Sequence, residues 1–153
     1  MLTQKAKYAL KAMIHLAACH DGKPVLIADL AEVERLPKKF LERILLDLKT
    51  HGLLVSRKGK GGGYMLARPA NQISLGEIIR RMDGPLAPVP CVSKMAYRKC
   101  PDCRDERTCV VKPIMKEVRD SIAYVLDGTT LADAVHRTGG ATGRNFESFN
   151  FQI

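Results

Sequence analysis

Residues 38–66 decide the fold, and they read K-K-F-L-E-R-I-L-L-D-L-K-T-H-G-L-L-V-S-R-K-G-K-G-G-G-Y-M-L. The first part predicts a helix that ends at Gly52, because its apolar residues recur at helical spacing and charged residues fall between them. Two short apolar runs follow, at 53–57 and 64–67, and a glycine-rich tip joins them. Such a pair of runs is typical of a β-hairpin. The helix side chains expected to be buried are Phe40, Leu41, Ile44, Leu45 and Leu48.

Two more helices are predicted before this stretch. Apolar residues at helical spacing run through 3–19, and a shorter pattern covers 26–35. Pro37 then suits the first turn of the following helix, where its missing N–H costs nothing. Cys19, at the end of the first helix, is expected to be a small buried residue. Helix, short helix, basic helix and hairpin in this order predict a mainly α fold, with a winged helix-turn-helix domain over residues 1–83.

The chain after the wing predicts a helix and then a loop. Ser74 and Glu77 have the spacing of a capping box, so a helix is expected to begin near Leu75. Residues 84–109 are rich in charge and proline and have little apolar periodicity. This composition indicates a loop, which is assigned as a cysteine-rich sensing loop.

A long helix with a continuous apolar stripe is predicted from Val110. Thr130 and Asp133 form a second capping-box pair that opens a short last helix. Residues 110–136 are therefore assigned to a dimerisation helix and a short C-terminal helix, and residues 137–153 to a weakly structured tail. The stripe is expected to be a dimer seam, although the sequence alone leaves an internal core helix open. Its residues are Val111, Ile114, Met115, Val118, Ile122 and Val125.

Positive charge is concentrated in the first part of the chain. Residues 1–83 carry a net charge of +7, against +2 for residues 84–153. A basic half is the electrostatic footprint of a polyanion binder, although a solvated basic surface gives the same count. No apolar run suits a signal peptide or a membrane span, so a cytoplasmic location and no membrane partner are expected. The glycines at 59–63 lack the pattern of a nucleotide-phosphate loop, and no catalytic grouping is found, so an enzyme is not expected.

The predicted winged helix makes double-stranded DNA the expected partner. A helix fits the major groove and presents polar side chains to base edges, while glycines let a hairpin approach phosphates closely. Arg43 and Lys39 are expected to read bases, and Lys58 and Lys60 to hold the wing on the DNA backbone. The full set of expected DNA contacts is Gln4, Lys5, Lys38, Lys39, Glu42, Arg43, Arg57, Lys58, Lys60, Gly61 and Tyr64.

Four of the five cysteines lie in the predicted loop, at Cys91, Cys100, Cys103 and Cys109. In a cytosolic protein, clustered cysteines are more often metal-binding or redox-active than structural disulfides. Thiolates suit both iron–sulfur clusters and zinc. From the residues alone, an iron–sulfur cluster, a zinc site and a metal-free thiol–disulfide switch all stay open. Basic neighbours are expected to lower the thiol pKa values; they are Lys99, Arg104 and Arg107.

Four short motifs carry a family resemblance. They are Phe40-Leu41-Glu42-Arg43, Arg57-Lys58-Gly59-Lys60-Gly61-Gly62-Gly63-Tyr64, Ile73-Ser74-Leu75-Gly76-Glu77-Ile78-Ile79 and Thr129-Thr130-Leu131-Ala132-Asp133. With these motifs the chain resembles the IscR, NsrR, RirA and CymR family of bacterial winged-helix transcription regulators, over roughly residues 1–136. The resemblance implies a homodimer on a DNA operator, with a long crossing helix near the dimer axis and a cluster loop beside it.

The family's iron–sulfur members carry three cysteines in this loop, and the matching residues here are Cys91, Cys103 and Cys109. The family's fourth ligands are not matched. Members similar to IscR have a histidine ligand where this chain has Lys112. Members similar to NsrR take an acidic ligand from the first helix of the partner subunit, and the matching position in this chain is near Tyr8. Cys100 is extra to the family pattern and is the candidate for the fourth position, and the alternative is a cluster that keeps a labile iron. The resemblance thus implies a 2Fe-2S or 4Fe-4S cluster, with zinc or no metal as the alternative.

These expectations combine into one mechanism. A homodimeric regulator senses iron–sulfur status, redox state, nitric oxide or iron, and a change at the cluster shifts the loop and the long helix, which resets the spacing of the two DNA-reading heads. A coupling free energy of about 1–3 kcal/mol corresponds to about a 5- to 150-fold change in DNA affinity. A metal- or thiol-binding protein without a DNA role is the alternative from a different class.

Overall fold

The structure, a computed structural model of the chain, describes residues 2–19 and 22–138. The order of its elements confirms a mainly α winged helix-turn-helix with a β-hairpin wing, followed by a long helix. Most of the tail predicted from residue 137 onward lies outside the described residues. The elements are α1 (Gln4–Ala18), α2 (Ile27–Val33), α3 (Lys38–Thr50), β1 (Leu54–Arg57), β2 (Gly63–Leu66), the 3-10 turn η1 (Ala70–Gln72), α4 (Leu75–Asp83), the 3-10 turn η2 (Pro90–Val92), α5 (Val111–Asp127) and α6 (Leu131–Arg137).

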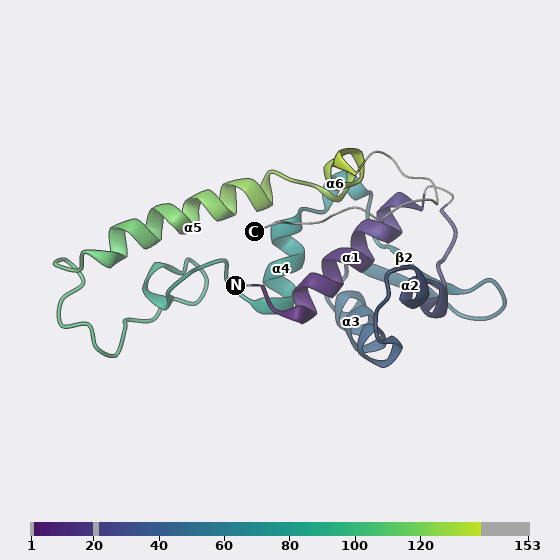
Figure 1. Cartoon of the computed structure of the whole chain (residues 1–153), viewed down its shortest axis with the longest axis horizontal. Helices are drawn as coiled ribbons and strands as arrows, with labels where there is room; N and C mark the ends of the chain where they lie inside the picture. Colours follow the sequence, from purple (N-terminus) through teal and green to yellow (C-terminus); the bar gives the residue numbers. More distant parts are fainter. Residues whose placement is uncertain (1, 20–21, 139–153) are drawn as a thin grey trace.

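The molecule has two unequal parts. Figure 1 shows α1, α2, α3, α4, α6 and the hairpin gathered at one end, with α5 and the segment before it extending away. Apart from the short turn η2, the predicted loop at 84–109 is confirmed as irregular chain. Because η2 packs against α5, the loop and the long helix form a single arm on the winged-helix part.

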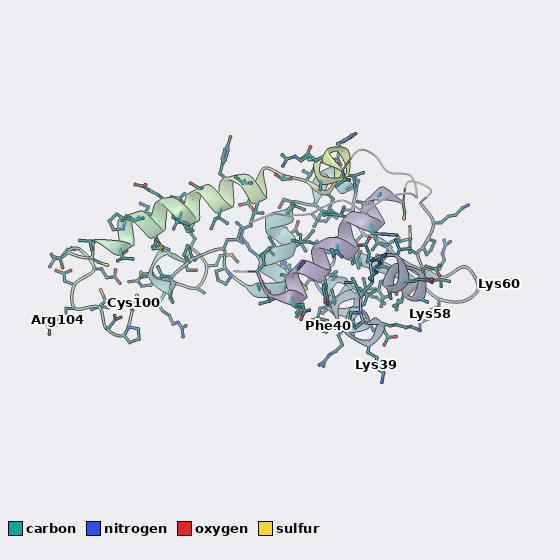
Figure 2. The ribbon with its side chains drawn as sticks, viewed as in Figure 1. Lys39, Phe40, Lys58, Lys60, Cys100 and Arg104 are labelled. Carbon is teal, nitrogen blue, oxygen red and sulfur yellow. The ribbon has the colours of Figure 1, made fainter. Side chains whose placement is uncertain are left out.

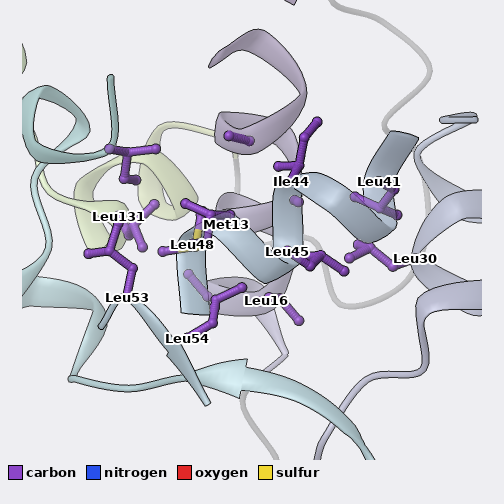
Figure 3. Close-up of a cluster of buried hydrophobic side chains, with 14 of the residues drawn as sticks. Met13, Leu16, Leu30, Leu41, Ile44, Leu45, Leu48, Leu53, Leu54 and Leu131 are labelled. Atoms are coloured by element: carbon purple, nitrogen blue, oxygen red, sulfur yellow. The ribbon is translucent and has the colours of Figure 1, made fainter. Parts of the chain in front are cut away.

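The core of the winged-helix part is built around α3. Its apolar stripe meets residues of α1, α2 and β1 in one buried cluster, which Figure 3 shows in close-up. Burying a leucine or isoleucine side chain contributes about 1.5–3 kcal/mol, so this stripe decides which side of α3 remains exposed. Phe40 is only partly buried, and its ring meets that of Tyr8 edge-on with 5.7 Å between centroids. The fully buried members include Met13, Leu30, Leu41, Ile44, Leu45, Leu48, Leu53 and Leu54.

The chain returns to this core after α5. Leu131 of α6 is fully buried in the same cluster, and its N–H donates to the Ile73 carbonyl at 2.9 Å. The Leu75 N–H donates to the Thr129 carbonyl, also at 2.9 Å. The short C-terminal helix that the sequence grouped with the dimerisation helix therefore packs on the winged-helix core, and it anchors the C-terminal end of α5 there.

The wing is a two-stranded antiparallel hairpin whose register pairs Leu54 with Leu66 and Arg57 with Gly63. Its base is held by Val25, which exchanges two backbone hydrogen bonds of 2.9 Å with Tyr64. A Cβ on Gly63 would lie 2.2 Å from the Val25 carbonyl oxygen, and Gly63 has a positive φ of 145°. Only glycine fits this position without moving the backbone.

Only one of the two predicted capping boxes is complete. Thr130 and Asp133 form the complete, reciprocal box. Ser74 caps α4 by accepting from the Glu77 N–H at 3.1 Å, but the Glu77 side chain accepts from Arg68 at 2.7 Å instead of returning to Ser74. A nearby arginine therefore replaces the backbone N–H as the partner of that carboxylate.

Two local predictions are wrong. Cys19 is exposed, because it is the C-cap of α1 and its backbone has left the helical path that buries the apolar stripe. Pro37 is the N-cap of α3 and lies one residue before the first turn. The predicted end of α3 is confirmed, since Gly52 follows the C-cap His51 with a φ of 74°.

Candidate nucleic-acid interface and cysteine loop

The exposed side of α3 carries its charged residues. Lys38, Lys39, Glu42 and Arg43 are all exposed, because the apolar stripe of the same helix faces the core. Figure 2 shows Lys39 pointing away from the core into solvent. Side chains in this position can reach base edges when a helix lies in a DNA major groove.

The wing presents a second basic group. Arg57, Lys58, Lys60 and Gly61 are exposed. In Figure 2 the side chains of Lys58 and Lys60 project from the hairpin at the same end of the molecule as Lys39, far from the cysteine loop. Tyr64 is different, since it is partly buried against the core and its backbone bonds Val25, so it positions the wing.

Polar contacts fix α3 relative to its neighbours. Lys5 of α1 pairs with Asp47 of α3 at 2.7 Å, and Lys49 donates to the Ser56 hydroxyl of β1 at 2.6 Å. The side-chain amide of Gln4 donates to the Tyr8 hydroxyl at 2.7 Å. Gln4 and Lys5, predicted as phosphate contacts, are thus already engaged within the protein, and a phosphate at Lys5 competes with Asp47.

A polar cluster around the buried Glu34 holds α1 against the end of α2, and no sequence pattern predicts it. Glu34 is 5% exposed, and its carboxylate lies 2.9 Å from Nδ1 of His15. Lys11 donates to the Glu34 backbone carbonyl at 3.3 Å. Lys11 and His15 are spaced i, i+4 and so lie on the same side of α1. Their common partner Glu34 is the C-cap of α2, and no local sequence pattern connects it to them.

The four loop cysteines interact as two neighbouring pairs, Cys91 with Cys100 and Cys103 with Cys109. Cys91, in η2, is buried, and the other three are half-buried. The Cys100 thiol is hydrogen-bonded to Cys91, and the Cys103 N–H donates to the Cys100 carbonyl at 3.1 Å. Cys109 is close enough for its charge to act on Cys103. The backbone closes the loop beside Cys91, where the Arg98 N–H donates to the Pro90 carbonyl at 3.3 Å.

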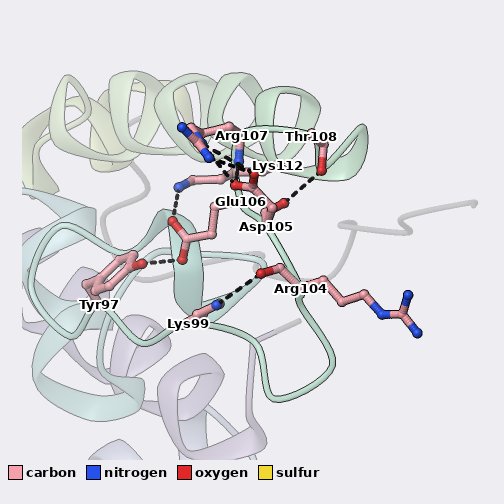
Figure 4. Close-up of polar contacts among 8 residues, drawn as sticks. All are labelled: Tyr97, Lys99, Arg104, Asp105, Glu106, Arg107, Thr108 and Lys112. Carbon is pink, nitrogen blue, oxygen red and sulfur yellow. Dashed lines mark hydrogen bonds and ion pairs between the residues drawn. The ribbon is translucent and has the colours of Figure 1, made fainter.

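The expected lowering of thiol pKa values by basic neighbours is wrong for two of these cysteines. The hydrogen bond to Cys91 raises the pKa of Cys100. Loss of solvation, followed by the charge of Cys109, raises the pKa of Cys103 more than Lys99 lowers it. The reason is where the arginines lie: the Arg104 side chain points out into solvent (Figure 4), and Arg107 pairs with Asp105 at 3.1 Å.

A polar group connects the loop to the start of α5. The Tyr97 hydroxyl donates to Glu106, and Lys112 of α5 pairs with the same carboxylate at 2.6 Å (Figure 4). The Lys112 Nζ also lies 5.9 Å from the centre of the Tyr97 ring. The Lys112 hydrogen bond lowers the pKa of Glu106, and Glu106 raises the pKa of Tyr97. Sequence patterns left Tyr97 without a role; here it orders the loop.

The donor set of the loop fits a thiolate-held metal centre in kind and in number. Four cysteines lie on one segment, with Cys91 and Cys100 as neighbours, and soft metals prefer thiolates. Within residues 2–19 and 22–138, no three Cys, His, Asp or Glu side chains converge on the position of a single ion. Lys112, which follows the last loop cysteine by three residues, is held by Glu106.

The apolar stripe of α5 is exposed along the whole helix. Arg119 is the one buried residue of this helix, so the stripe lies outside the core of the single chain. Met115 is half-buried. The exposed stripe residues are Val111, Ile114, Val118, Ile122 and Val125, at 38–57% exposure.

In the part of the chain that the structure describes, none of the helices combines the length and the apolar character that crossing a bilayer requires.

Comparison with known proteins gives the family. The sequence matches the family model "Rrf2: Iron-dependent Transcriptional regulator" over residues 2–137. An rrf2-like HTH-type transcriptional regulator of Rhodobacter capsulatus is 45% identical over 136 residues, which cover 87% of this chain and 91% of that protein. The HTH-type transcriptional regulator IscR of Escherichia coli is 30% identical over 135 residues, covering 88% of this chain and 80% of IscR.

Solved structures agree. CymR, the global cysteine regulator of B. subtilis, matches with a TM-score of 0.75 and 30% identity, over 90% of this chain and 97% of CymR. IscR of T. potens matches with a TM-score of 0.73 and 30% identity, over 95% of this chain and 93% of IscR. The chain therefore belongs to the Rrf2 family of transcriptional regulators, together with IscR and CymR.

Proposed function

We propose that this Rrf2-family regulator binds a double-stranded DNA operator as a homodimer and senses iron–sulfur or redox status through an iron–sulfur cluster in its cysteine loop. The observation that carries the DNA-binding part is the placement of charge. The exposed charged side of α3 and the basic wing tip lie at the end of the molecule opposite the cysteine loop. Residues 1–83 then read DNA, residues 84–109 sense, and residues 110–136 include the dimerisation helix.

Each part of the basic surface has its own role in this proposal. Arg43 and Lys39 contact base edges from α3, and Glu42 between them can accept from a cytosine amino group. Lys38 and the wing residues Arg57, Lys58 and Lys60 neutralise phosphates, with Gly61 allowing close approach. Base contacts set sequence preference, whereas phosphate contacts set affinity and its dependence on salt.

The exposed stripe of α5 supplies the dimer contact in this proposal. Five aliphatic side chains at helical spacing are in water in the single chain, and a second copy of the same helix is complementary to them. Two reading heads related by a two-fold axis read two half-sites about one DNA turn apart. The expected operator is therefore an inverted repeat.

Cys91, Cys103 and Cys109 would hold the cluster, with Cys100 in the fourth position. Their support is the donor chemistry of the loop and the contact that places Cys100 beside Cys91. When bound, an iron–sulfur cluster supplies an oxidant-sensitive metal–thiolate centre. The protein's own contribution is to hold the four thiols on one segment and to connect that segment to α5 through Glu106 and Lys112.

Because Cys91 and Cys100 are neighbouring thiols, a second candidate for sensing is a disulfide between them in the metal-free protein. Two thiols give a disulfide, two protons and two electrons. Hydrogen peroxide can accept the two protons and the two electrons and become two water molecules. DNA reading by α3 and the wing is the same in this alternative.

Two measurements test the proposal. Protein purified without oxygen should show visible absorption with matched iron and sulfide; stoichiometric zinc, or no metal, moves sensing to zinc or to the thiol pair. The same protein should enrich one inverted-repeat sequence from random double-stranded DNA. Arg43→Ala should lose about 1–3 kcal/mol of binding free energy and relax preference at one position of each half-site. Only sequence-blind binding by the wild-type protein would contradict the DNA-reading assignment.

A further inference from the structure

The one buried residue of α5 is an arginine. Arg119 is 9% exposed on a helix whose apolar side chains are largely in water. One guanidinium nitrogen donates to the Val92 carbonyl at 2.6 Å, and Nε donates to Asp120 at 2.9 Å. Val92 follows Cys91 directly and lies in the turn η2. The guanidinium therefore joins the middle of α5 to the backbone beside a candidate cluster ligand.

Polar contacts hold α5 to its own chain at three levels. Lys112 meets Glu106 near the helix start, Arg119 meets Val92 in the middle, and Asp127 meets Arg80 of α4 at the end. The first two contacts reach the cysteine loop, and the third reaches the winged-helix part. The position of α5 between the two parts thus depends on which of these contacts are made.

Apolar contact between the loop and α5 comes from the turn η2, whose Cys91 and Val92 are buried. An open pocket of about 190 Å³ lies beside this contact, and it is lined by Leu86 and Met95 of the loop, Arg119 and Ala123 of α5 and Arg80 of α4. No apolar side chain of α5 is buried. The hydrogen bond from the Arg119 guanidinium to the Val92 carbonyl is charge-assisted and joins two specific atoms, so it gives this contact a direction that apolar packing alone does not.

We propose that Arg119 is the positioning residue that couples the cysteine loop to the dimer helix. Its hydrogen bond to the Val92 carbonyl holds the backbone next to Cys91 against the middle of α5, so a rearrangement at the cysteines moves the helix. This inference rests on the proposed function, since it names the residue through which the state of the loop reaches the DNA-reading heads. Arg119 itself touches neither the DNA-reading surface nor the thiols in this role.

A first experiment tests the contact without DNA and without the cluster. Hydrogen exchange is measured on metal-free wild-type protein, Arg119→Met, Arg119→Lys and the control Lys116→Met. Lys116 is exposed on the same helix, so its variant removes the same charge without the contact. Arg119→Met should exchange faster over residues 89–98, where the amides of Val92, Ser93 and Arg98 are bonded within the turn. Equal exchange in Arg119→Met and Lys116→Met would overturn the proposal.

A second experiment tests the coupling. The ratio of operator dissociation constants between metal-free and cluster-loaded protein should be about 5-fold or more in the wild-type protein and in Lys116→Met. It should fall to near unity in Arg119→Met, with the metal-free affinity and the thermal midpoint close to wild type, and recover partly in Arg119→Lys. If this ratio of dissociation constants in Arg119→Met equals that of the wild-type protein, the proposal is overturned. Wild-type protein that holds no cluster or reads no operator refutes the proposed function instead, and hydrogen exchange then decides the Arg119 contact.

Discussion

The guanidinium of Arg80 on α4 forms a two-bond ion pair with the carboxylate of Asp127 at the end of α5, with N–O distances of 2.6 and 2.7 Å. Gly76 lies directly beneath this pair, since a Cβ there would fall 2.0 Å from an Asp127 oxygen. The pair connects the arm formed by α5 and the loop to the winged-helix part. The pair thus fixes the C-terminal end of α5 to α4.

This ion pair predicts a pH-dependent contribution to stability. The Arg80 hydrogen bond lowers the pKa of Asp127, so the contribution is present above the ordinary aspartate value of about 3.9 and is lost as the pH falls through the lower folded value. Because the side chains are 26% and 44% exposed, we expect Asp127→Asn to cost only about 0–1 kcal/mol at pH 7. Urea unfolding at pH 7 and pH 3 should show this difference shrinking. The control is Glu117→Gln on the same helix, and a difference that is equal at both pH values would refute the expectation.

The wing assignment predicts a change in salt dependence. Lys60→Ala should weaken binding to all DNA sequences and reduce the slope of log affinity against log salt by about 1, because one phosphate contact is lost. Titrations at several salt concentrations measure the slope. Lys116→Ala removes the same charge from α5 and should leave the slope unchanged. An unaltered slope in Lys60→Ala would remove the wing from the interface.

The exposed stripe predicts the oligomeric state. Ile122→Lys places a charge within the proposed dimer contact and should give a monomer in sedimentation experiments. The operator affinity should then fall about 100-fold or more, because linked binding modules gain about 10²–10⁴-fold in avidity. The control is Tyr124→Lys, which changes a residue that is 83% exposed and lies outside the stripe. An Ile122→Lys protein that remains dimeric would place the contact on another surface.

Because α6 returns to the core, shortening its buried side chain should lower the stability of the protein strongly. Leu131→Ala should lower the free energy of unfolding by about 2–5 kcal/mol, since a fully buried leucine is replaced by a cavity. Val33→Ala on α2 removes an exposed side chain and should change it by less than about 0.5 kcal/mol. Denaturant titrations of both variants decide whether α6 belongs to the cooperative winged-helix unit.

The elements of the fold could be predicted because their signals are local. The apolar period of α3, the glycine after it and the Thr130–Asp133 box each specify structure within a few residues, and the structure confirms them. The long helix was equally clear from its stripe. Besides Cys19 and Pro37, the prediction differs from the structure at Glu77, whose partner Arg68 precedes the helix and lies outside the capping pattern.

The contacts that organise the candidate site could not be predicted, because their partners are distant in sequence. Arg119 bonds the Val92 carbonyl across 27 residues, and nothing in the helical pattern separates it from a surface arginine. Glu34 is buried through residues of α1. The predicted lowering of the thiol pKa values was wrong for a related reason. A count of nearby charges ignores where the side chains point, and Arg104 points into solvent.

The cysteine loop predicts a graded loss of the metal centre. Serine at Cys91, Cys103 or Cys109 should abolish bound iron and sulfide in protein purified without oxygen, because each removes a thiolate ligand. Cys100→Ser should retain a centre that loses iron faster than the wild type, since the fourth thiol is gone and the other three remain. Cys19→Ser, outside the loop, is the control and should match the wild type. If Cys100→Ser also matches the wild type in iron content and in its rate of loss, the fourth ligand comes from elsewhere. The contact between Cys100 and Cys91 then belongs to the metal-free state alone.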